Sequence, residues 1–105
     1  MATASKARDK RWAVAVMERY DGKCPHCNEE ADGPHHIVPR GNRSTRYVLE
    51  NGLNACLRLH RRFEAKGKVR RKAIRIYVGE ERYDNLQKIA HGQARPEDFG
   101  YKVVE

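Results

Sequence analysis

The stretch from Cys24 to His60 decides the fold, and it reads CPHC at 24–27, PHHIVP at 34–39 and ENGLNACLRLH at 50–60. Two cysteines with two residues between them precede a pair of histidines, and an asparagine stands nine residues ahead of the closing histidine. Thiolates and imidazoles are the usual ligands of zinc and related ions. The spacing of the cysteines therefore predicts metal ligands.

Length and composition limit the class of protein. At 105 residues the chain is one small domain, for which a bound metal would add stability. No apolar run reaches the roughly 18 residues of a membrane span, and Met1 to Lys10 lacks the apolar core of a signal peptide. We expect a cytoplasmic protein without membrane contact, in which three cysteines serve as ligands rather than forming disulfides.

The net charge of +8 is concentrated in one segment. Between Leu57 and Arg75 there are nine Lys or Arg residues and one acid, Glu64, whereas the rest of the chain carries 13 basic and 13 acidic residues. Such a strip suits a polyanion, and binding through phosphates would depend steeply on salt. The alternative is a solvated helical face without a partner.

The ordered motifs resemble the HNH nuclease family, also called His-Me finger nucleases, and among them the zinc-ribbon type and small phage HNH proteins. Gly79 to Tyr83 is similar to the tails of those phage proteins. The resemblance implies an α+β fold with a ββα-metal core and flanking helices. It makes residues 1–105 a single domain whose core lies at about 24–66. It also implies that the protein acts in a bacterial or phage-infected cell.

The same resemblance assigns the catalytic residues. It makes His36 the general base, His35 and His60 ligands of a catalytic divalent ion, and Asn51 a clamp that orients the base. Asn54 competes with Asn51, but it lies only six residues before His60. The implied ion is Mg²⁺ or Mn²⁺, with Ni²⁺ and Zn²⁺ as alternatives. Because side chains alternate along a strand, His35 and His36 should face opposite sides unless the strand is bent or frayed there.

The cysteines resemble the structural zinc site of zinc-ribbon HNH proteins, with Cys24, Cys27 and Cys56 as ligands. The family has a fourth cysteine where this chain has Leu59. His26, His91 or a water molecule could complete the site, or the cysteines could be buried without a metal.

Periodicity predicts the elements around these motifs. Trp12, Val16 and Tyr20 form a helical stripe that predicts Trp12 in the core. After Gly67 the residues Val69, Ala73, Ile76 and Tyr77 form a helical stripe, but a short alternation of apolar and polar residues would also fit a strand. We favour the helix. The expected elements are a helix at 5–20, strands at 35–38 and 53–56, and helices at 57–66, 68–78 and 80–91.

These features predict a metal-dependent endonuclease that nicks double-stranded DNA with little sequence specificity and acts as a monomer. The alternative is a zinc-knuckle DNA-binding or phage packaging-accessory protein without catalysis; an RNA-binding zinc module lacks the surface aromatics for base stacking. Phage packaging proteins are then further partners. The expected DNA-binding residues are Arg40, Arg43, Arg46, Arg58, Arg61, Arg62, Arg70, Arg71 and Lys72.

Overall fold

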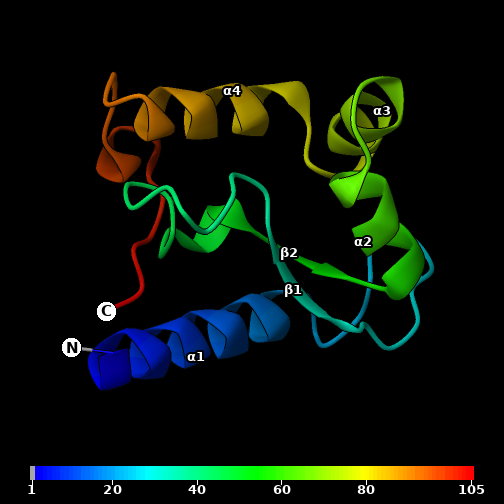
Figure 1. Ribbon diagram of the computed structural model, residues 1–105, viewed down its shortest axis with the longest axis horizontal. Helices are drawn as coiled ribbons and strands as arrows, with labels where there is room; N and C mark the ends of the chain where they lie inside the picture. The colour runs from blue at the N-terminus through cyan, green and yellow to red at the C-terminus, as the bar shows by residue number, and fades with distance from the viewer. Residues whose placement is uncertain (1) are drawn as a thin grey trace.

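The computed structural model describes residues 2–105 and confirms the predicted α+β class (Figure 1). Its described part contains four α-helices, one two-stranded sheet and two 3₁₀ helices. In chain order they are α1 (Ala2–Arg19), β1 (Gly33–His36), η1 (Leu49–Asn51), β2 (Gly52–Ala55), α2 (Leu57–Glu64), α3 (Lys68–Tyr77), α4 (Glu80–Ala90) and η2 (Pro96–Phe99).

The two strands run antiparallel, with Gly33 opposite Ala55 and His36 opposite Gly52. Both strands begin earlier than predicted, by two residues for β1 and one for β2. One backbone bond continues past His36, from the Ile37 N–H to the Asn51 carbonyl at 2.9 Å, but the Asn51 N–H turns away to the Val48 carbonyl in η1. One residue further on, the Val38 N–H and carbonyl both bind the Asn51 side chain instead of a partner strand, so the ladder does not resume.

Helices and the C-terminal segment surround the sheet (Figure 1). α1 contacts both strands and η1, and α2 follows β2 directly. The last residues return to the segment before η1, where Val48 pairs with Val103 and the Val104 N–H donates to the Tyr47 carbonyl at 2.8 Å. No helix in residues 2–105 is both long and apolar enough to cross a membrane.

The core is built from aliphatic and aromatic side chains of the four helices, of β2 and of the loop after β1. Trp12 is 3% exposed, as the helical stripe of α1 predicts, and its indole N–H donates to the Val48 carbonyl. The helix predicted after Gly67 is confirmed, but its buried face differs: Ala73 and Ile74 are buried, whereas Val69 and Ile76 are exposed. The largest fully buried apolar side chains are those of Phe63, Ile37, Leu53, Leu59, Leu86 and Ile89.

Gly52 lets α1 approach the sheet at van der Waals distance. A Cβ at this position would lie 2.2 Å from a methyl group of Val16 and 2.9 Å from the Trp12 ring. These atoms belong to buried side chains that have no room to withdraw, so a larger residue has to push α1 away from β2. This steric requirement explains a glycine inside a strand.

We predict that Gly52→Ala lowers the free energy of unfolding by about 1–3 kcal/mol, the usual cost of overpacking a core. Thermal and urea denaturation followed by circular dichroism would measure it. Gly41→Ala is the matched control, because a Cβ at Gly41 would meet nothing within 4 Å. Equal stability of the two variants would contradict the packing described here.

Candidate functional site

His35 and His60 come together from different elements. His35 projects from β1 and His60 from α2, and their ring centroids lie 4.9 Å apart with the rings nearly perpendicular. The His60 Nε2 is 3.1 Å from the carbonyl oxygen of Gly33. Since a carbonyl only accepts, Nε2 carries the proton, and Nδ1 is left as the nitrogen that can bind a metal. Histidine ligands in proteins commonly donate their other N–H to a carbonyl in this way.

His36, the last residue of β1, packs against α1. Its ring stacks on Trp12, with centroids 3.8 Å apart and 7° between the planes. Its Nε2 lies 3.0 Å from the carbonyl oxygen of Arg46, so Nε2 donates and Nδ1 is the basic nitrogen. The two contacts fix the plane of the ring and its tautomer, as a general base requires.

Burial lowers the pKa of both histidines. For His35, burial and then the charges of His60 and Arg70 lower the pKa to about 4. For His36, burial lowers the pKa, while the hydrogen bond to Arg46 and the charge of Asp9 act in the opposite direction. Both rings are therefore neutral at pH 7, which is the form that binds a metal or accepts a proton.

Asn51 holds the loop that follows β1, residues 37–48. Its side-chain oxygen accepts the Val38 N–H at 2.8 Å, and its NH₂ group donates to the carbonyls of Val38 and Thr45, each at 3.1 Å. Asn51 is fully buried, so these bonds are shielded from water. The next residue after Thr45 is Arg46, whose carbonyl orients His36. The clamp predicted for Asn51 thus has the necessary contacts.

Asn54 does not share this position. It is also buried, but its NH₂ group donates to the Lys23 carbonyl at 3.3 Å, and its side-chain oxygen has no partner among the described residues. These contacts lie on the side of the sheet near the cysteines, away from the loop. The hydrogen bonds therefore favour Asn51 over Asn54 as the clamp.

His35 and His36 line one open pocket of about 410 Å³ at the end of β1. Glu64 also lines the pocket, and it stands four residues after His60 on the same face of α2. Carboxylate oxygens are preferred ligands of Mg²⁺. Glu64 belongs to none of the sequence motifs, and its helical spacing from His60 is the one signal that points to it. The remaining lining residues are Pro34, Pro39, Arg40, Phe63 and Arg70.

The three cysteines form a second candidate site. Cys24 and Cys27 lie in a tight hairpin closed by the Lys23–Glu30 bridge, and Cys56 precedes α2 as its N-cap residue. Their sulfur atoms all lie within 4.8 Å of one another, close enough to bind one metal ion. In the described part of the chain this is the only group of three such ligand atoms; His35, His60 and Glu64 are not gathered as closely.

The environment of Cys24 favours its thiolate. Burial opposes ionisation, but the backbone N–H groups of Cys56, Cys27 and His26 are directed at the sulfur and together lower the pKa of Cys24. The His26 N–H lies 3.3 Å from that sulfur. Backbone donors around a thiolate stabilise the negative charge that a metal ligand carries.

Neither histidine proposed as a fourth ligand joins the cysteines. The ring of His26 hydrogen-bonds the Tyr77 hydroxyl, and that of His91 lies 2.7 Å from the Gln87 carbonyl. Leu59, at the position where the resemblance led us to expect a fourth cysteine, is fully buried in the core. Among residues 2–105 the donor set is therefore three thiols.

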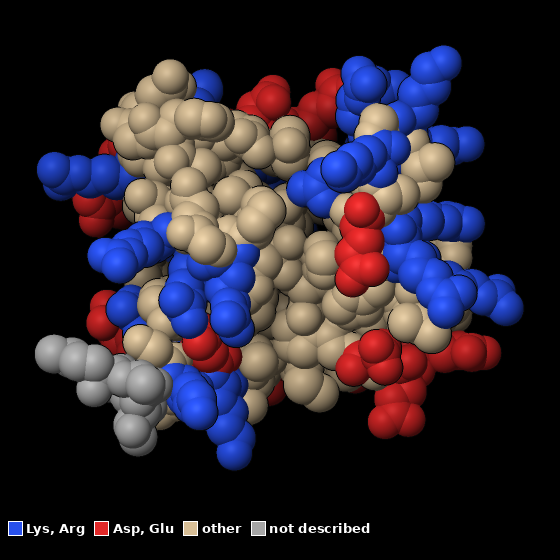
Figure 2. All heavy atoms as spheres, viewed as in Figure 1, with Lys and Arg blue, Asp and Glu red and all other residues tan. Residues whose placement is uncertain are grey.

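The predicted DNA-binding residues fall into two groups. Lys and Arg side chains gather over α2 and α3 (Figure 2). Two of the predicted arginines have protein partners: Arg46 forms a two-point ion pair with Asp9 at 2.6 and 3.0 Å, and Arg70 donates to the Ile37 carbonyl at 3.0 Å and to that of Phe63. The exposed ones are Arg40, Arg43, Arg58, Arg61, Arg62, Arg71 and Lys72.

No protein-family model, curated protein or solved structure matches the chain.

We predict that Asn51→Ala lowers the free energy of unfolding by roughly 3 kcal/mol, because the buried N–H and carbonyl groups of the loop lose their partner. Asn54→Ala, a buried control three residues away, should cost about 1 kcal/mol, since only one weak hydrogen bond is lost. Urea denaturation measures both. A larger loss for Asn54→Ala would show that the clamp is assigned to the wrong asparagine.

Proposed function

We propose that the protein is a metal-dependent endonuclease that hydrolyses phosphodiester bonds of double-stranded DNA, with β1, β2 and α2 as its ββα-metal unit. The observation that carries this proposal is the arrangement of the two adjacent histidines of β1. One lies edge-on to His60, with the ring centroids 4.9 Å apart, and the other is held as a single tautomer beside the pocket that both histidines of β1 line. Binding alone would need neither arrangement.

Each residue then has a defined part in the reaction. His35, the Nδ1 atom of His60 and the Glu64 carboxylate would hold one divalent ion, Mg²⁺ or Mn²⁺. That ion would stabilise the charge that develops on the phosphate and on the leaving oxygen. Nδ1 of His36 takes the proton from the attacking water. The Nε2–H group of His36 donates a hydrogen bond to the Arg46 carbonyl. This bond keeps the protonated nitrogen turned away from the attacking water.

The exposed basic residues support DNA as the substrate. They lie on α2 and α3 and on the loop after β1, which also borders the pocket. Contacts of arginine and lysine with phosphates position DNA without reading its sequence. We therefore propose that nicks fall at many sequences and that Arg46 and Arg70 contribute less to binding than their exposed neighbours, because protein groups already occupy them.

The cleavage assay uses supercoiled plasmid with Mg²⁺ or Mn²⁺, and with EDTA as the metal-free control. We expect nicked circles as the first product, since one base and one metal attack one strand per binding event. His36→Ala should lower the rate by about 10²–10⁴ with unchanged DNA affinity. His60→Ala should shift the metal titration to higher concentration.

His91→Ala is the matched control, because His91 is exposed at the end of α4. DNA binding without any metal-dependent cleavage by the wild-type protein would support the alternative, a zinc-knuckle DNA-binding or packaging-accessory protein. Wild-type rates in His36→Ala would instead remove His36 from the mechanism.

The cysteine cluster is proposed to hold one structural zinc ion. Protein purified without added metal should contain about one zinc per chain by elemental analysis. Cys27→Ser and Cys56→Ser should each lose the zinc, because a site with three thiolates cannot spare one. Full reactivity of all three thiols with a thiol reagent in the native, zinc-free protein would contradict the assignment.

A further inference from the structure

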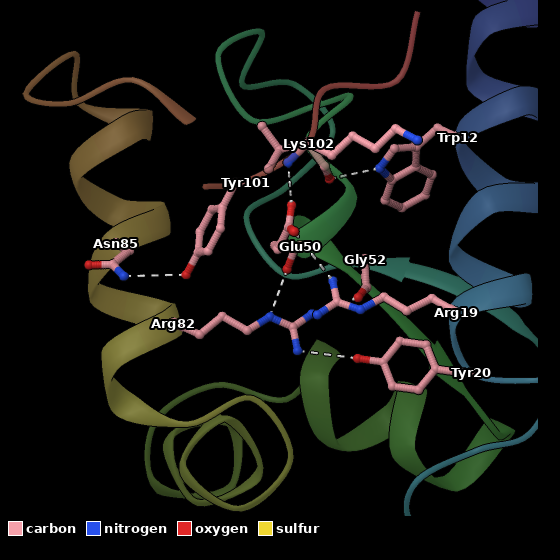
Figure 3. A network of polar contacts seen from close by, with 10 residues as sticks. Trp12, Arg19, Tyr20, Glu50, Gly52, Arg82, Asn85, Tyr101 and Lys102 are labelled. Carbon is pink, nitrogen blue, oxygen red and sulfur yellow. Dashed lines mark hydrogen bonds and ion pairs between the residues drawn. The ribbon is translucent and has the colours of Figure 1, made fainter. Parts of the chain in front are cut away.

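Arg82, in the first turn of α4, binds the backbone on both sides of Asn51. Its Nε donates to the carbonyl of Glu50 at 2.8 Å, and its Nη2 donates to the carbonyl of Gly52 at 2.8 Å. Its Nη1 donates to the Tyr20 hydroxyl at 3.2 Å. Figure 3 shows the guanidinium between these groups, reaching from α4 toward the segment that carries Glu50 and Gly52.

Within residues 2–105, Arg82 binds neutral oxygen atoms and no carboxylate. None of the ion pairs among the described residues includes Arg82, and its half-buried guanidinium is directed at two carbonyls and a hydroxyl. The planar guanidinium presents its donors in a fixed geometry, which a flexible lysine ammonium cannot reproduce at two acceptors. Arg82 therefore sets the distance and direction between the carbonyls that flank Asn51.

The Glu50 side chain restrains the same segment from the other direction. It accepts the Lys102 backbone N–H at 2.9 Å and lies 3.9 Å from a guanidinium nitrogen of Arg19 (Figure 3). The end of α4 also reaches the loop, because the Asn42 side chain donates to the Ala90 carbonyl at 3.1 Å. Thus α4 contacts the backbone around Asn51 through Arg82 and the loop after β1 through the Ala90 carbonyl.

We propose that Arg82 is a positioning residue for the general base His36, an inference that rests on the proposed function. It acts through the contacts already described: Arg82 fixes the backbone of Asn51, Asn51 holds Val38 and Thr45, and the adjacent Arg46 carbonyl selects the tautomer of His36. Arg82 does not reach the pocket and does not touch substrate.

The test compares Arg82→Gln and Arg82→Lys with Tyr20→Phe. The tyrosine variant removes only the hydroxyl contact and leaves both carbonyl bonds in place, so it is the matched control. Circular dichroism and thermal unfolding identify the temperature range in which each variant is folded. All other measurements are made within that range.

Two readouts report on position rather than on stability. Nitrogen-15 NMR of the histidine rings at alkaline pH, in protein as purified and without added Mg²⁺ or Mn²⁺, shows which ring nitrogen of His36 carries the proton. Hydrogen exchange of the Val38 amide reports on its bond to Asn51. We expect Arg82→Gln to give a mixture of His36 tautomers and faster Val38 exchange, Arg82→Lys an intermediate result, and Tyr20→Phe the wild-type result.

Cleavage should show the same order. Arg82→Gln should lower kcat by about 10- to 100-fold with KM changed less than about 3-fold, as expected for a group that orients a catalytic residue. A folded Arg82→Gln, or Arg82→Lys if the former does not fold, with wild-type tautomer and kcat would overturn the proposal. A shifted tautomer in a protein that never cleaves would support the positioning role and reject the nuclease instead.

Discussion

Three buried hydrogen bonds from the Asn51 side chain determine how the chain leaves the sheet. By occupying both backbone groups of Val38 they keep the strand pairing from resuming beyond Ile37, and by holding Thr45 they close the loop back toward η1. The loop then offers the Arg46 carbonyl to His36, while Trp12 of α1 covers the ring. Without the amide, the backbone N–H and carbonyl of Val38 and the carbonyl of Thr45 would lose these buried partners.

The surrounding elements serve this arrangement in physically different ways. α1 supplies an apolar face that meets the sheet closely because Gly52 has no side chain. α4 supplies polar contacts through Arg82, and the C-terminal segment binds the backbone at 47–49. The cysteine hairpin lies before β1 and Cys56 lies before α2, so a metal there would join the two segments that bring His35 and His60 together.

Local patterns predicted the helices, the two strands and the burial of Trp12, because these depend on periodicity and turn residues. They also brought out Cys24, Cys27 and Cys56, whose side chains do lie together. The partners of Arg46, Arg70 and Arg82 could not be predicted, because they depend on which carboxylate or carbonyl the folded chain places nearby. For the same reason the sequence could not exclude His26 as a ligand before its bond to Tyr77 was known.

The most direct measurement is a titration of the purified protein, which retains any zinc at its cysteines, with Mn²⁺, followed by NMR of the assigned histidine rings, since a paramagnetic ion broadens only signals close to it. The account predicts that His35 and His60 broaden first, that His36 follows as a near neighbour, and that His91 stays sharp. Equal broadening of all histidines, or sharp signals from His35 and His60, would show that no divalent ion binds in this pocket.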